Sequence, residues 1–317
     1  LVGSEMCIRD RCYISDSVDQ NILNRMRKLI QSIDVDALTM NIESLAECMF
    51  THKWINPFPK FKYSERPDTA TAAILDGNIV IMVDNSPAVM IIPASIFDII
   101  EEADDFNFSP MIGSYLRITR FFFSIVTWIL TPLWLLFVNN PDWVPEFMKF
   151  VLITDDITVP VLLQLLILEL AVDGLKLAAV NTPTMLSTPL SIVAGIVVGE
   201  YAVSSGWFNP EALLYMAVVT VGTYGQTNFE MGYAFKFLRV LTLILTQIFN
   251  LGGFIAGVVI SVLMIAFNRT ITGKSYIYPL IPWDGKMLKR KVLRVRLPHS
   301  YCLLYTSDAA DEARSVD

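Results

Sequence analysis

An uncharged run of 29 residues, from Val240 to Asn268, constrains the fold of this chain more than any other feature. A straight helix of this length would extend roughly 43 Å, whereas the hydrocarbon core of a membrane is about 30 Å thick. We therefore expect the run to tilt, to extend beyond the core or to break, and Gly252 and Gly253 mark the expected break. In each case the run predicts a membrane protein.

A second uncharged stretch, from Phe121 to Val138, has the 18 residues that a spanning helix needs, and Pro132 can kink it. Three further apolar clusters lie at about 157–180, 190–203 and 212–224. The composition agrees, with 54% hydrophobic and only 17% charged residues. We therefore predict a polytopic α-helical membrane protein.

Charges beside the spans predict their orientation, because lysine and arginine near a span favour the cytosolic side. Arg117 and Arg120 precede the first span, the loop 139–156 is mainly acidic, and the chain after Asn268 is basic. Both ends are therefore predicted to be cytosolic, which requires an even number of crossings. Five apolar clusters conflict with that parity, so one cluster is re-entrant or incomplete, or the last run makes two passes. We favour four crossings, with the cluster at 157–180 partly re-entrant.

Before the first span, the sequence predicts a small α/β soluble domain on the cytosolic side. Apolar residues recur there at helical spacing in two amphipathic helices. The two stripes consist of Ile22, Met26, Leu29 and Ile33, and of Leu38, Ile42, Leu45 and Met49. Two β-type runs, 78–83 and 88–92, flank turn residues and predict a hairpin, and 95–103 predicts a further helix. The predicted domains are 12–116 for the soluble domain, 117–269 for the transmembrane domain and 270–301 for a basic cytosolic tail.

The two ends of the chain look foreign to it. Residues 1–11 and 302–317 resemble translated sequencing-adapter read-through, and we set them aside from the fold. The cysteines that remain, Cys12 and Cys48, offer neither a disulfide framework nor paired metal-ligand spacing. We therefore expect no cofactor and no metal site.

Three ionisable residues stand out in the apolar cluster at 157–180. Glu169, Asp173 and Lys176 fall at positions i, i+4 and i+7, so a helix places them on one side. Ionisable residues at membrane depth are expensive and usually face a bundle interior or a wet pathway. They either form a polar network that fixes helix packing or line an ion path. Glu200 poses the same question, with a helix-end carboxylate at the membrane interface as its alternative.

Other signals are weaker. Polar residues and prolines at 181–183 and 187–189 interrupt the apolar pattern, either as broken helices that line a polar cavity or as a plain loop between spans. The histidines are His52 and His299, and we find no nucleophile–base pair, phosphate loop or metal spacing. We predict neither catalysis nor nucleic-acid binding.

One motif carries a resemblance to a known family. Glu65, Arg66, Pro67 and Asp68 read ERPD, and the chain continues as TATAAILDGNIVIMVDNSPAVMIIP. This segment resembles the A subunit family of GerA-type spore germination receptors. The segments Leu166 to Glu211 and Gly273 to Pro282 look like the stage V sporulation protein AF branch of that family. The resemblance runs from about residue 34 to residue 296.

The resemblance implies a polytopic protein of the spore inner membrane that acts in germination. It implies a homo-oligomeric channel that releases ions. Such a channel would contact membrane lipid and other germination membrane proteins, and one of these partner proteins would perform most of the nutrient sensing. A non-channel scaffold, or an accessory subunit for germination receptors or for dipicolinic acid transport, is the alternative. Full-length members have a longer amino-terminal region, so this chain resembles their carboxy-terminal two-thirds. For ERPD we favour a structural role over ligand contact, and Asn85, where the family tends to have glycine, suits a turn.

Overall fold

The computed structural model describes residues 9–15, 18–33, 42–49, 56–154, 156–181, 195–271, 273 and 275–294. The chain divides into two compact units. The first, which we call the sheet unit, comprises Leu1–Thr119 and Met264–Asp317, and the second, the helical unit, comprises Arg120–Leu263. The predicted interruptions at 182–183 and 187–189 lie outside the described residues, as do 1–8 and 302–317.

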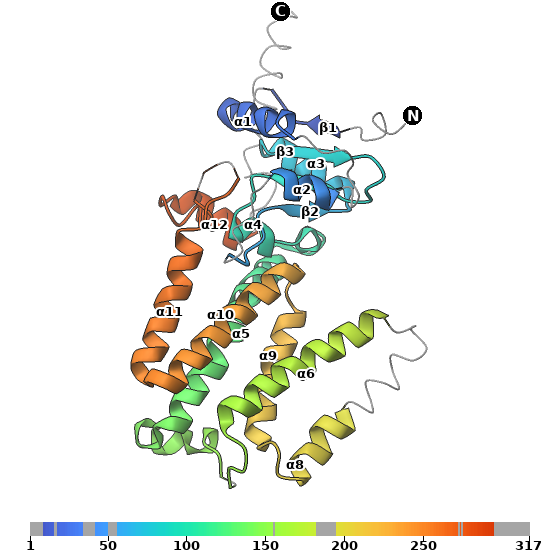
Figure 1. The fold of residues 1–317 in the computed structure, drawn as a ribbon. Helices are drawn as coiled ribbons and strands as arrows, with labels where there is room; N and C mark the ends of the chain where they lie inside the picture. The colour runs from blue at the N-terminus through green and yellow to red at the C-terminus, as the bar shows by residue number, and fades with distance from the viewer. Residues whose placement is uncertain are drawn as a thin grey trace, which may run out of the picture. The chain divides into compact units, whose positions relative to one another are not determined.

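The sheet unit contains a four-stranded antiparallel sheet in the order β1-β3-β4-β2 (Figure 1). Its strands are β1 (Arg9–Cys12), β2 (Lys62–Ser64), β3 (Ile79–Val83) and β4 (Val89–Ile92). Strands β3 and β4 pair antiparallel, which confirms the predicted hairpin. Asn85 in the connecting turn has a φ of 59°, a left-handed conformation that asparagine tolerates better than most residues.

The edge strand β1 differs from the sequence analysis. Residues 9–11 belong to the terminal segment that was set aside from the fold, yet with Cys12 they pair antiparallel with β3, from Arg9 opposite Val83 to Cys12 opposite Val80. The physical reason is the outer edge of β3, whose backbone N–H and C=O groups need partners that a further strand supplies.

Two amphipathic helices build the core of the sheet unit. The helices of this unit are α1 (Gln20–Gln31), α2 (Ile42–Met49), α3 (Pro67–Leu75), α4 (Ile96–Ile100), η1 (Ala103–Phe106) and α12 (Gly285–Val292). Met26 of α1 and Leu45 of α2 are fully buried in one cluster with Ile79, Ile81 and Met90 of the sheet. The two predicted stripes are thereby confirmed, except at Leu38, which lies outside the described residues.

The segment after the last apolar run folds back into the sheet unit. Ile271 joins the core cluster and Tyr276 is fully buried. The Lys60 ammonium donates a hydrogen bond of 2.8 Å to the backbone carbonyl of Arg269, and the backbone N–H of Ile96 donates one of 3.0 Å to the carbonyl of Tyr276. The described part of the predicted tail, 270–301, is therefore built into the same unit as the amino-terminal strands, because its apolar side chains complete that core.

Buried ion pairs hold α12 against α4 and the start of α5 (Pro110–Asn139) within the sheet unit. Lys291 lies 2.5 Å from a carboxylate oxygen of Asp98, and Arg117 lies 2.5 Å from Glu101 and 3.3 Å from Asp105. Burial alone would raise the pKa of Asp98, but the Lys291 ammonium and the hydrogen bonds from Ser95 together hold that pKa below its usual value. Arg117, predicted as a charge flanking the first span, is thus a buried residue.

The helical unit continues from α5. Its elements are the rest of α5, η2 (Pro141–Trp143), η3 (Glu146–Val151), α6 (Val161–Asn181), the π-helix η4 (Gly195–Tyr201), α8 (Ala202–Ser204), α9 (Pro210–Tyr224), α10 (Phe229–Phe249) and α11 (Leu251–Ala266). Among the described helices, α5 and α10 are long and apolar enough to cross a membrane. The chain is therefore mostly helical with a small sheet, as predicted, and the number of spans stays a prediction.

The long uncharged run breaks, which is one of the three outcomes expected from its length. The break falls at Asn250, whose φ is 51°, just before the expected glycine pair. Helices α10 and α11 then run antiparallel as a hairpin (Figure 1). Gly253 faces the Leu245 carbonyl so closely that a Cβ there would overlap it, and a Cβ at Gly257 would lie 2.9 Å from the Cα of Thr242. The glycines thus serve close helix approach.

Candidate functional site

A cavity of about 80 Å³, lined by both charged and apolar side chains, lies within the helical unit, between α6, α9 and the amino-terminal half of α10. Its ionisable lining residues are Glu169, Asp173 and Lys176 of α6, and Lys236 and Arg239 of α10, with Tyr224 and Tyr233 beside them. The wall also contains apolar side chains such as Val172 and Met216. Charged groups of both signs therefore share one small space inside an otherwise apolar set of helices.

Glu169 and Arg239 form the most deeply buried pair of the cavity. The guanidinium makes a bidentate contact, with Nε 2.5 Å from Oε1 and Nη2 2.8 Å from Oε2 of Glu169. A third nitrogen, Nη1, donates a hydrogen bond of 2.6 Å to the backbone carbonyl of Thr127 on α5. The exposed fraction is 5% for Glu169 and 3% for Arg239. This geometry neutralises both charges and ties α6, α10 and α5 together.

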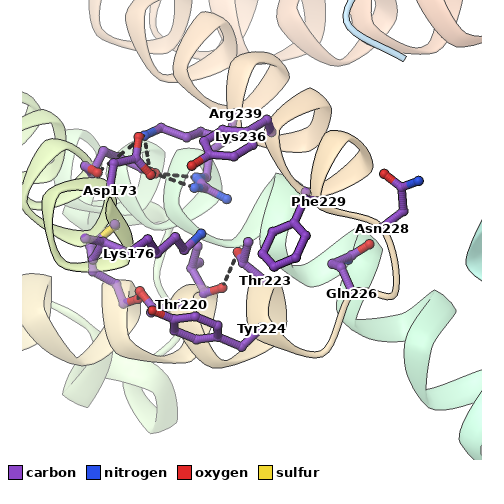
Figure 2. Close-up of a pocket in the computed structure, with 16 residues that line it drawn as sticks. Asp173, Lys176, Thr220, Thr223, Tyr224, Gln226, Asn228, Phe229, Lys236 and Arg239 are labelled. Carbon is purple, nitrogen blue, oxygen red and sulfur yellow. Dashed lines mark hydrogen bonds and ion pairs between the residues drawn. The ribbon is translucent and has the colours of Figure 1, made fainter. Parts of the chain in front are cut away.

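Asp173 pairs with Lys236, one helical turn away along both helices (Figure 2). The same ammonium donates a hydrogen bond of 3.3 Å to the backbone carbonyl of Glu169 and lies 3.8 Å from that residue's Oε2. Glu169 and Asp173 are four residues apart on α6, and their partners on α10 are three residues apart. One helical turn on each helix therefore brings two carboxylates opposite two cations. Each predicted carboxylate is thus paired with a cation from another helix.

Lys176 is placed differently. Its ammonium lies over two aromatic rings, 5.3 Å from the centroid of Tyr224 and 5.5 Å from that of Tyr233. Figure 2 shows its side chain extending toward Thr223, away from the two ion pairs. The ammonium is therefore held by cation–π contacts.

The structure thus brings together three of the predicted residues, Glu169, Asp173 and Lys176, around one cavity. Whether they conduct ions or fix the packing stays a prediction. Lys236 and Arg239 were not predicted as site residues, because they precede the uncharged run that starts at Val240 and so fell outside the expected helix. Their i, i+3 spacing just before an uncharged run was the signal available.

The other predicted site residues lie elsewhere. Glu200 is exposed in the π-helix η4 and does not line the cavity. In the ERPD motif, Glu65 is exposed and Pro67 occupies the first turn of α3, where proline needs no N–H partner. Helix α3 itself was not predicted, because its alanines and threonines carry no apolar period.

Arg66 and Asp68 of the same motif form a surface cluster in the sheet unit. The Arg66 guanidinium pairs with Asp68 and with Asp104, a residue of η1. Hydrogen bonds from Arg66 and from the backbone of Thr69 lower the pKa of Asp68 to about 2. The motif therefore joins the start of α3 to η1, and its structural role stays a prediction.

The chemistry available at the cavity is electrostatic. Over the described residues, no group of three His, Cys, Asp or Glu side chains is placed to hold a metal ion. The lining instead offers ammonium and guanidinium donors, carboxylates held in pairs, and the amides of Gln226 and Asn228. Such groups can stabilise a small ion or water molecules among apolar helices.

The chain matches a family model described as Bacillus/Clostridium GerA spore germination protein over residues 6–301. It is 35% identical over 287 residues to stage V sporulation protein AF of Bacillus subtilis (strain 168), a match that covers 90% of this chain and 58% of that relative. It is 26% identical to spore germination protein GerLA of Bacillus cereus, with 89% and 58% covered. For spore germination protein KA of Bacillus subtilis the identity is 25%, with 89% and 52% covered.

The chain therefore spans little more than half the length of these curated relatives. No solved structure matches it significantly.

Proposed function

Because this chain belongs to the GerA family of spore germination proteins, we propose that it is part of an ion-conducting complex of the spore inner membrane that takes part in ion release on germination. The membership confirms the resemblance inferred from the ERPD segment. The relatives matched are longer, so the proposal concerns the full-length protein, of which this chain forms a part.

The observation that carries the proposal is the charged cavity of the helical unit. Two carboxylates and three cations line a space between α6, α9 and α10, although α10 is apolar enough to cross a membrane. Ionisable side chains at membrane depth are costly, and they are commonly found where an ion or water pathway passes. Rings of charged side chains set the selectivity of many channels. An oligomer of this chain would bring several such cavities together.

The architecture of the sheet unit supports a cytosolic location for both ends. Residues before α5 and residues after Leu263 fold into this one unit, and the contact of Lys60 with Arg269 is part of it. A compact unit lies on a single side of a membrane. The number of crossings between its two parts is therefore even, and the basic residues of α12 favour the cytosolic side.

The surface of the helical unit supports contact with lipid and with other membrane proteins. Large apolar side chains on α5, α10 and α11 are exposed, among them Phe122, Ile248 and Ile255. Such a surface is unfavourable in water and favourable against acyl chains or a neighbouring subunit. We propose that copies of the chain and other germination membrane proteins share this surface with lipid.

The alternative is a scaffold that assembles germination proteins without conducting ions. One observation favours it: the bidentate Glu169–Arg239 pair is buried and complete, as expected of a network whose role is to fix helix packing. In this reading the cavity is a by-product of the packing.

Reconstitution distinguishes the two functions. The full-length protein is purified, incorporated into liposomes alone and together with its partner germination proteins, and assayed for ion flux. We expect flux above that of protein-free liposomes in at least one of these preparations. Incorporated protein that raises flux in neither preparation would favour the scaffold. Cysteine labelling of the 139–156 loop and of α12 from each side of the membrane tests the topology, since labelling of both from one side would overturn it.

A further inference from the structure

We propose that the cavity of the helical unit binds a small monovalent anion, held by the ammonium of Lys176. Among the described residues that line the cavity there are three cations, Lys176, Lys236 and Arg239, and two carboxylates, Glu169 and Asp173. The lining thus carries one positive charge in excess. This inference rests on the proposed function, to which it adds the class of ligand at the conducting site.

Each of the two carboxylates already has a cationic partner. Glu169 accepts both arms of the Arg239 guanidinium, and Asp173 is in contact with the Lys236 ammonium. A cation entering the cavity would have to displace one of these built-in cations, leaving it desolvated. Cation binding is therefore opposed by the same pairs that stabilise the helices.

Lys176 is the remaining cation. Its ammonium lies over the rings of Tyr224 and Tyr233, which attract it but carry no net charge. The nearby hydroxyls of Thr220 and Thr223 donate their protons to the backbone carbonyls of Met216 and Val219. At this end of the cavity Lys176 is thus the charged donor, beside the hydroxyls of Tyr224 and Tyr233, and a bound anion would balance the one excess positive charge of the lining.

The space suits a small ligand. A cavity of about 80 Å³ exceeds several-fold the roughly 10 to 15 Å³ that one water molecule requires. It accommodates an ion such as chloride, or a carboxylate group, with accompanying water. The amides of Gln226 and Asn228 lie at the other end, beyond Phe229 (Figure 2). There the Asn228 side chain caps α10 and Glu230 lies in its first turn, so the helix end adds little positive charge. It is the Lys176 end of the cavity that favours negative charge.

Anion-dependent stability of the purified full-length protein tests the proposal without any measurement of transport. The melting temperature is measured in detergent while chloride or acetate replaces gluconate, a much bulkier anion, at constant sodium concentration and ionic strength. We expect a rise in melting temperature that saturates with chloride or acetate, because a ligand that binds only the folded state stabilises it.

Substitutions assign the effect to one side chain. Lys176→Gln should abolish the saturable rise, whereas Lys176→Arg should retain it. Lys149→Gln is the matched control, since Lys149 lies in the same unit with its side chain 60% exposed. A wild-type protein without a saturable response would overturn the proposal whatever the variants do. A response that survives in Lys176→Gln would overturn the assignment.

The outcome is independent of the conductance assay. Saturable anion binding by a protein that never raises ion flux would refute the conducting function and leave the anion site standing. Flux that is selective for cations, from a protein whose stability ignores small anions, would refute the anion site and leave the conducting function standing.

Discussion

The sheet unit and the helical unit both enclose an apolar core, but they expose different residues. The fully buried side chains of the sheet unit are mostly apolar, such as Met26, Leu45 and Ile79. In the helical unit Arg239 and Glu169 are buried, while Phe229 is 82% exposed. The first unit is held by the hydrophobic effect, as in a protein surrounded by water. The second adds the buried Glu169–Arg239 pair and close helix contacts to its own apolar core, which contains Trp134, Leu165 and Leu243.

The largest effect is expected when one partner of the buried ion pair in the helical unit is removed. Arg239→Met leaves the Glu169 carboxylate buried without its bidentate partner, and we expect a loss of about 3 to 5 kcal/mol of stability. Membrane abundance and the melting temperature of the purified protein are the measurements.

The double variant Glu169→Met with Arg239→Met provides the control, because it removes both charges at once. It should recover most of the lost stability. A double variant as unstable as Arg239→Met alone would contradict the view that the unpaired carboxylate is what destabilises. Glu169→Gln and Asp173→Asn in the same background extend the test: normal ion efflux from a normally abundant Glu169→Gln protein would rule out Glu169 as a required pore residue.

The next largest effect is expected when a side chain in the apolar core of the sheet unit is shortened. Ile81 is fully buried, and Ile81→Ala should cost about 2 to 5 kcal/mol through lost burial and the cavity left behind. Its neighbour Met82 points the other way along the strand and is 39% exposed, so Met82→Ala should stay within roughly 0.5 kcal/mol. Hydrogen exchange of the β3 amides measures the difference. Equal effects at the two positions would contradict the described core.

A smaller effect concerns the α10–α11 hairpin. A Cβ at Gly253 would overlap the Leu245 carbonyl, whereas one at Gly252 meets open space. Gly253→Ala should therefore cost about 1 to 3 kcal/mol through overpacking. Gly252→Ala should be neutral or slightly stabilising, since alanine favours helix. Thermal denaturation of the two adjacent variants makes the comparison, and a neutral Gly253→Ala would show that the two helices are farther apart than described.

The last effect depends on pH and grows gradually, at no more than ~1.4 kcal/mol per pH unit. Burial lowers the pKa of Lys60 from 10.5 to about 8. Below about pH 8 the side chain is protonated in both the folded and the unfolded states, and the full cost of burying its charge is present. Between about pH 8 and 10.5 the folded protein has lost this proton while the unfolded chain keeps it, so stability should rise with pH.

The slope from this one group is at most ~1.4 kcal/mol per pH unit. Other groups titrate in the same range, so the difference between the wild type and Lys60→Met isolates the contribution of Lys60. Melting temperatures on either side of pH 8 provide the measurement. A difference that does not change with pH would show that Lys60 has an ordinary pKa.

Local patterns predicted much of the sheet unit. The stripe containing Ile22 and Met26 specifies which face of α1 is buried, and Asn85 marks the turn of the hairpin, because both signals depend on neighbours in the sequence. The contact between Lys60 and Arg269 was not predictable in this way. These residues are 209 positions apart, and the local sequence around each residue does not indicate the contact.

The helical unit was predicted less completely. The i, i+4, i+7 spacing of Glu169, Asp173 and Lys176 located the charged face of α6, and the structure places all three at the cavity. Their partners on α10 were missed, because a search for uncharged runs excludes the cations that a polar interior requires. Which cation meets which carboxylate follows from helix register, and register is a property of packing.

The sheet unit is assembled from two stretches of chain that are far apart in the sequence, and this affects how it folds during biosynthesis. Strands β3 and β4 leave the ribosome long before Ile271 and Tyr276, the residues that complete the interior of the same unit. During the synthesis of every helix in between, this unit stays open on the side that these residues will fill. Its closure is therefore a late event, and a chain that stops short of residue 276 presents an unfinished domain to the proteases of the cell.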